Sequence, residues 1–113
     1  MNDLRITTEL LSDRFRLISV AGELDLYATP QLKPELEAAS SGPRAVIVDL
    51  TECTFIDSSA LGVLVTAKKA LAAKEVELSL VISDRNILKV FEITGLARVF
   101  TIHPTRADAV ADR

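Results

Sequence analysis

The chain has 113 residues, of which 49% are hydrophobic and 26% charged, and its 13 basic and 16 acidic residues give a net charge of −3. This composition is typical of one globular domain, so we expect a single domain over residues 1–113. Without a basic tract or a long apolar run, the sequence argues against nucleic-acid and membrane partners. We therefore expect a cytoplasmic protein.

The first part of the chain predicts a β-hairpin. Apolar and polar residues alternate over 4–10, which is typical of a half-buried strand. A second β-rich stretch over 15–21 follows a turn-forming Ser12-Asp13 pair. Residues 22–28 are then expected to form a loop.

A helix and a buried strand are predicted next. Thr29 and Pro30 have the residue types of an N-cap and a first helical position, and apolar residues follow at spacings of three and four. Because Pro34 removes a backbone donor, we expect regular helix to begin only near Lys33. The strand over 45–50 begins with a continuous apolar run, which favours the centre of a sheet covered on both faces.

The second half predicts strands that alternate with helices. The expected elements are a helix from Ser58 to about Ala73 with Asp57 as N-cap, a strand over 75–82, a helix capped by Asp84 and ended by Gly95, an edge strand over 99–102 and a short helix over 105–111. Strand-helix-strand units favour right-handed parallel crossovers, whereas the initial hairpin is antiparallel. We therefore predict an α/β fold with one mixed β-sheet.

Enzyme and metal motifs are absent from the sequence. Neither Ser58 nor Ser59 lies in the G-x-S-x-G pattern, and a serine hydrolase would have to use His103, the only histidine. We interpret His103 as a loop residue and Cys53 as a small apolar filler. We expect no catalysis, no cofactor and no metal site, with a small serine hydrolase as a remote alternative.

The start of the long helix is the best candidate site, because α/β folds place their sites at the carboxyl ends of parallel strands. With Asp57 as cap, Ser58 becomes the first helical residue and its hydroxyl faces solvent. Gly62 lies one turn further on the same face, where glycine costs about 1 kcal/mol relative to alanine. This cost indicates close approach of a partner, whereas the simpler alternative is that all these residues are ordinary capping and packing residues.

Two motifs and an acidic turn resemble the anti-sigma-factor antagonist family of STAS domains. The segments are Val46-Ile47-Val48-Asp49-Leu50, then Phe55-Ile56-Asp57-Ser58-Ser59-Ala60-Leu61-Gly62-Val63-Leu64, with Gly22-Glu23-Leu24-Asp25 upstream. The resemblance covers nearly the whole chain and fits the predicted element order, with about five strands and about four helices. It implies a regulator of transcription that works by partner switching. It further implies that the unphosphorylated form binds an anti-sigma factor and releases the sigma factor.

The resemblance also implies the site residues and the partner. Ser58 is the expected phosphate acceptor, with Ser59 as fallback, and the partner is an anti-sigma factor that is also a serine kinase of the GHKL type. The expected partner-binding residues are Glu23, Asp25, Asp57, Ser58, Ser59, Ala60 and Gly62. Ala60 stands where many members of the family carry glycine. A phosphate adds about −1.5 to −2 charges, which would block the interface without unfolding the protein. The alternative is a STAS interaction module that is never phosphorylated.

Overall fold

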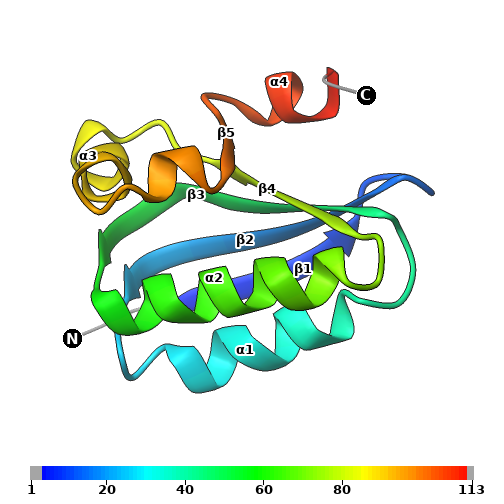
Figure 1. Ribbon diagram of the computed structural model, residues 1–113, viewed down its shortest axis with the longest axis horizontal. Helices are drawn as coiled ribbons and strands as arrows, with labels where there is room; N and C mark the ends of the chain where they lie inside the picture. The colour runs from blue at the N-terminus through cyan, green and yellow to red at the C-terminus, as the bar shows by residue number, and fades with distance from the viewer. Residues whose placement is uncertain (1–3, 112–113) are drawn as a thin grey trace.

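The computed structural model describes residues 4–111 and shows a β-hairpin followed by alternating helices and strands (Figure 1). The elements are β1 (Arg5–Leu10), β2 (Phe15–Leu24), α1 (Thr29–Ala38), β3 (Ala45–Ile56), α2 (Ser58–Ala72), β4 (Glu77–Val81), α3 (Arg85–Ile93), the 3₁₀ turn η1 (Leu96–Arg98), β5 (Thr101–His103) and α4 (Arg106–Ala111). The five strands form one sheet in the order β1-β2-β3-β4-β5. β1 is antiparallel to β2 and the other neighbours are parallel. The predicted mixed α/β fold, with β3 at the centre and β5 at an edge, is confirmed.

Helices cover the two faces of the sheet unequally, with α1 and α2 side by side over one face and α4 over the other (Figure 1). The larger core lies beneath α1 and α2, and alternate residues of the strands, such as Val46, Val48 and Leu50, point into it. A smaller apolar cluster joins Ile47 of β3 to Ala109 of α4 on the opposite face. Both faces of β3 are therefore covered over residues 45–50, whereas Thr51, Glu52, Thr54 and Phe55, nearer to α2, are exposed.

An ion pair fastens α4 to the sheet. Asp49, in β3, is only 4% exposed, and its carboxylate accepts hydrogen bonds from the Arg106 side chain and from both the hydroxyl and the amide of Thr51. Burial by itself raises the pKa of Asp49, but the hydrogen bonds from Thr51 and Arg106 outweigh it and hold the pKa below its ordinary value. The charged form is therefore favoured in the folded state, and its contribution to stability is lost as the pH falls through the folded pKa.

The predicted end of β2 is wrong, because the strand continues through residues 22–24 instead of becoming a loop at Gly22. Gly22 has a φ of 108°, and the pairing between β2 and β3 shifts register between Gly22 and Glu23. This irregularity uses the left-handed conformation that glycine adopts without strain, so β2 bends and still pairs. Both β2 and β3 consequently end at the start of α2.

The predicted start of α1 is also wrong. The helix begins at Thr29 with Ala28 at the N-cap, and Pro34 lies inside it. The amides of Gln31 and Leu32 donate to the Ala28 carbonyl at 3.0 and 3.1 Å, so the first turn forms before Pro34 is reached. Pro34 then removes only its own amide donor from the helix.

In the C-terminal part, the strands are shorter than predicted, whereas the Asp84 cap, the Gly95 stop and the short last helix are confirmed. Glu75 has a φ of 62°, which ends the α2 region and delays β4 until Glu77. His103 is the last residue of β5 rather than a loop residue. It is paired with Val81 of β4 in the parallel ladder, which carries the strand one residue further than expected.

Candidate functional site

Ser58 lies exposed at the first helical position of α2, directly after β3. Asp57 adopts an extended conformation, and its Oδ1 accepts a hydrogen bond from the Ala60 amide at 3.0 Å. This bond satisfies one of the amides that have no acceptor within the first turn. The predicted Asp57 cap and the predicted position of Ser58 are confirmed.

The second carboxylate oxygen of Asp57 binds a different segment of the chain. Its Oδ2 accepts a hydrogen bond from the Leu26 amide at 3.0 Å, and the Asp57 amide donates to the Leu24 carbonyl at 3.2 Å. One side chain therefore caps α2 and also fixes the turn that follows β2. The sequence indicated only the first of these roles.

The side chain of Asp25 stabilises the turn that follows β2. Asp25 Oδ1 accepts hydrogen bonds from the amides of Tyr27 and Ala28, at 3.0 and 3.1 Å, which is the pattern of an Asx turn. Asp25 therefore has a structural role in addition to its expected role as a partner contact. Glu23 is exposed at the end of β2, where it is paired with Phe55 of β3.

Three exposed apolar side chains close to Ser58 in the chain or in the adjoining turn were missed by sequence reasoning. Leu26 and Tyr27 are 57% and 83% exposed in the turn, and Phe55 is 49% exposed near the end of β3. We call Leu26 and Tyr27 the apolar turn. The sequence contained a signal for this surface, namely two large apolar residues directly after the acidic segment. Turns ordinarily carry polar residues, so apolar residues in a turn indicate an exposed apolar patch, and such patches mark interaction sites.

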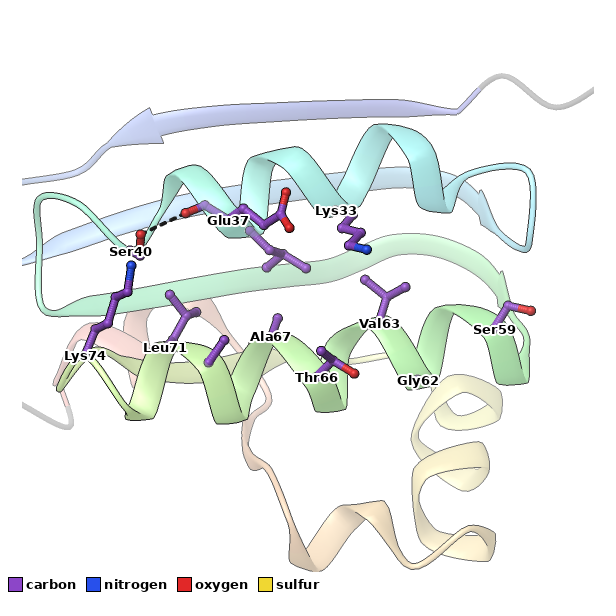
Figure 2. Close-up of a pocket in the computed structure, with 12 residues that line it drawn as sticks. Lys33, Glu37, Ser40, Ser59, Gly62, Val63, Thr66, Ala67, Leu71 and Lys74 are labelled. Atoms are coloured by element: carbon purple, nitrogen blue, oxygen red, sulfur yellow. Dashed lines mark hydrogen bonds between the residues drawn. The ribbon is translucent and has the colours of Figure 1, made fainter.

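Ser59 and Gly62 line a groove of about 450 Å³ between α1 and α2 (Figure 2). Ser59 is half-buried, whereas Ser58 is exposed. Gly62 is exposed, and a Cβ built on it would meet nothing within 4 Å. Ala60, in contrast, is fully buried in the core, so its expected part in partner binding is not supported, since its side chain is unavailable to a partner.

We expect Gly62→Ala to increase the free energy of unfolding by up to about 1 kcal/mol, because the helix gains propensity and no neighbour obstructs the methyl group. Chemical denaturation measures this gain. Ala70→Gly, at an exposed position of the same helix, is the matched control and should produce a loss of similar size. A destabilised Gly62→Ala protein would contradict the open space around Gly62.

Metal-ligating and thiol side chains are the other candidate functional groups within residues 4–111. No group of three or more His, Cys, Asp or Glu side chains in this range could hold a metal ion. Cys53 is buried, which raises the pKa of its thiol, and its Sγ lies 3.2 Å from the Phe55 carbonyl oxygen. This environment agrees with its interpretation as an apolar filler.

None of the helices in residues 4–111 has the length and apolar character needed to cross a membrane.

Comparison with known proteins assigns the family. The family model of the STAS domain matches residues 10–109, so the chain belongs to the STAS domain family. It is 44% identical over 87 residues to an anti-sigma-B factor antagonist of Listeria monocytogenes, and the alignment covers 75% of each chain.

Solved structures show the same fold. The structure of an anti-sigma factor antagonist from Mycobacterium paratuberculosis superposes with a TM-score of 0.88 at 27% identity and covers 97% of this chain and 93% of that chain. The Bacillus cell fate determinant SpoIIAA in its phosphorylated form superposes with a TM-score of 0.74 at 23% identity, covering 96% and 98% of the two chains. At this identity the second likeness shows a shared fold alone.

Proposed function

We propose that this chain is an anti-sigma factor antagonist whose unphosphorylated form binds an anti-sigma factor and thereby releases a sigma factor. The observation that carries the proposal is an exposed Ser58 at a helix start whose cap, Asp57, also holds the exposed apolar turn. Such an arrangement places a modifiable hydroxyl near apolar side chains suited to protein contact. The function named for the Listeria relative supports it.

Ser58 is the proposed phosphate acceptor, and the proposed partner is an anti-sigma factor that is also a serine kinase of the GHKL type. The exposure of Ser58 favours it over the half-buried Ser59, because a kinase must bring its nucleotide phosphate to the hydroxyl oxygen. ATP and Mg²⁺ would be bound by the kinase. This chain supplies the hydroxyl and the contact surface, and it acts as substrate.

Phosphorylation would act on the interface rather than on the fold. A phosphate on Ser58 meets the amides and the positive dipole end at the start of α2, which tolerate negative charge. It would also add about −1.5 to −2 charges next to Asp57 and close to the apolar turn. A partner would then have to desolvate a concentrated negative charge, which weakens binding. The fold shared with SpoIIAA in its phosphorylated form supports a switch that leaves the fold intact.

Two alternatives make different predictions. A serine hydrolase requires ester turnover, and the similarity to regulatory antagonists favours a binding protein over this class. A STAS interaction module that is never phosphorylated would use the same surface. Only a phosphorylation experiment separates this module from the proposed switch.

We expect the cognate kinase and ATP to add one phosphate to the wild-type chain and none to Ser58→Ala, because Ser58 is the exposed serine at the start of α2. Intact-mass spectrometry measures incorporation, and peptide mapping locates the phosphate. Ser59→Ala is the neighbouring control and should still accept phosphate. Undiminished incorporation into Ser58→Ala, or a phosphate mapped to Thr51 or Thr54, would refute the assignment.

A further inference from the structure

The edge formed by β1 is open. β1 is the outermost strand of the sheet, and no segment of the described chain lies beyond it (Figure 2). The outer side of such a strand presents backbone N–H and C=O groups that another strand can pair with. The opposite edge, β5, is much less suitable because it has only three residues and is followed by Pro104.

β1 carries two charged residues, Arg5 and Glu9, but lacks the other features with which proteins usually protect an edge. It pairs with β2 over all six residues, Arg5 to Leu10, without a register shift. Its sequence contains no proline and no lysine, and no bulge twists it away from a second strand. A regular edge of this kind is a template for strand addition.

The sequence around β1 is complementary to itself. If two copies pair antiparallel with Thr7 opposite Thr7, then Arg5 lies opposite Glu9 of the second copy, and Leu4 lies opposite Leu10. Ile6 then lies opposite Thr8. The charged positions therefore meet opposite charges and form cross-strand ion pairs, and Thr7 and Leu4 meet residues of their own kind, whereas the Ile6–Thr8 pair shares only β-branched shape.

The two faces of the sheet agree with this register. Arg5, Thr7 and Glu9 point to the face that carries Arg106, where they line a shallow pocket. Thr8 points to the other face, where its hydroxyl donates to Glu35 of α1 at 2.8 Å. Because residues directly opposite each other share a face, a continuous sheet permits only register shifts of two residues. Either such shift moves Arg5 or Glu9 opposite Thr7 and removes the ion pairs.

We propose that two copies of this chain associate through β1 in this antiparallel register, with the two-fold axis at Thr7. The pairing satisfies the open backbone groups and forms two symmetric Arg5–Glu9 pairs. It also covers Leu10, which is 62% exposed in the single chain. The contact area of one strand pair is small, so the dimer belongs to the weak, concentration-dependent class of interfaces.

Charge reversal tests the dimer. Sedimentation velocity on the full chain, at concentrations up to roughly 500 µM because small interfaces bind weakly, should show a monomer–dimer equilibrium. Arg5→Glu and Glu9→Arg should each weaken self-association by roughly tenfold or more, since both ion pairs become like-charge pairs. An equimolar mixture of the two variants should dimerise again, because each strand then meets its opposite charges.

Matched controls separate association from folding. Within the chain, Arg5 and Glu9 are paired across the strands with Ala21 and Leu17, so both variants should melt at the wild-type temperature. Lys89→Glu, at an exposed position of α3, changes the net charge as Arg5→Glu does and should leave dimerisation unchanged.

A cysteine at the proposed axis tests the register. Thr7→Cys should form a covalent dimer under mild oxidation, because directly opposed positions of an antiparallel pair have Cα atoms within disulfide range. The native Cys53 is buried, so wild type should remain uncrosslinked. A wild type that stays monomeric over the whole range, or a dimer that withstands both charge reversals, overturns the proposal. A mixture that fails to dimerise also overturns it. None of these tests involves the kinase or Ser58.

Discussion

Ser58→Asp should weaken binding of the proposed anti-sigma factor roughly hundredfold, because a carboxylate facing the partner beside Asp57 must be desolvated without a counter-charge. The same substitution should change the free energy of unfolding by no more than about 0.5 kcal/mol. Ser58 is exposed, and the start of α2 favours negative charge. The substitution should therefore weaken partner binding without a comparable loss of stability.

Titration calorimetry with the anti-sigma factor and thermal melting of the free protein measure the two effects. Ser58→Asn is the matched control, because it has nearly the size of aspartate but no charge, and it should retain most of the affinity. If Ser58→Asp instead loses much of its stability, the switch acts through the conformation of the chain rather than by blocking the surface.

Asp57→Ala is expected to lower the free energy of unfolding by about 2 kcal/mol, which combines the loss of a helix cap with the loss of a second hydrogen bond. The bonds removed are those from the Ala60 and Leu26 amides. The affinity for the partner should fall as well, because the apolar turn loses the hydrogen bond from the Leu26 amide to Asp57 at the start of α2. Urea denaturation gives the stability, and limited proteolysis reports the opening of residues 25–28.

Asp84→Ala provides the comparison for this second prediction. Asp84 caps α3 through the amides of Asn86 and Ile87, at 2.7 and 3.1 Å, and the hydrogen bonds of its carboxylate stay within its own helix start. Its loss should cost about 1 kcal/mol, as for an ordinary cap, and should leave the turn resistant to protease. If the turn in Asp57→Ala is equally resistant to protease and this variant binds the partner as wild type does, the hydrogen bond between Leu26 and Asp57 has no part in recognition.

Local sequence signals predicted most of the fold. Asp57 and Asp84 each precede an apolar stripe of helical spacing, and both are N-caps in the structure. Errors arose where the outcome depends on neighbouring strands. Gly22 was predicted to begin a loop. In the structure it allows a register shift in the pairing of β2 with β3, and this shift depends on the neighbouring strand. Similarly, β5 is defined by its ladder with β4 rather than by its own three residues.

The candidate site was predicted only in part for the same reason. The pattern around Ser58 located the exposed serine and its cap, because both depend on adjacent residues. It did not reveal that Asp57 also binds Leu26, which is 31 positions away in the sequence. The pairing of Asp49 with Arg106 spans 57 positions and was likewise invisible to any local pattern.

The turn after β2 is already ordered in the free chain, and this affects how a partner would be recognised. Asp57 holds the Leu26 amide, Asp25 holds the amides of Tyr27 and Ala28, and the Thr29 hydroxyl donates to the Leu26 carbonyl at 2.9 Å. Its backbone entropy is therefore lost during folding rather than on association. A partner that covers the Tyr27 ring immobilises little more than side chains, at about 0.5–1.5 kcal/mol each. More of the free energy of each contact then appears as affinity.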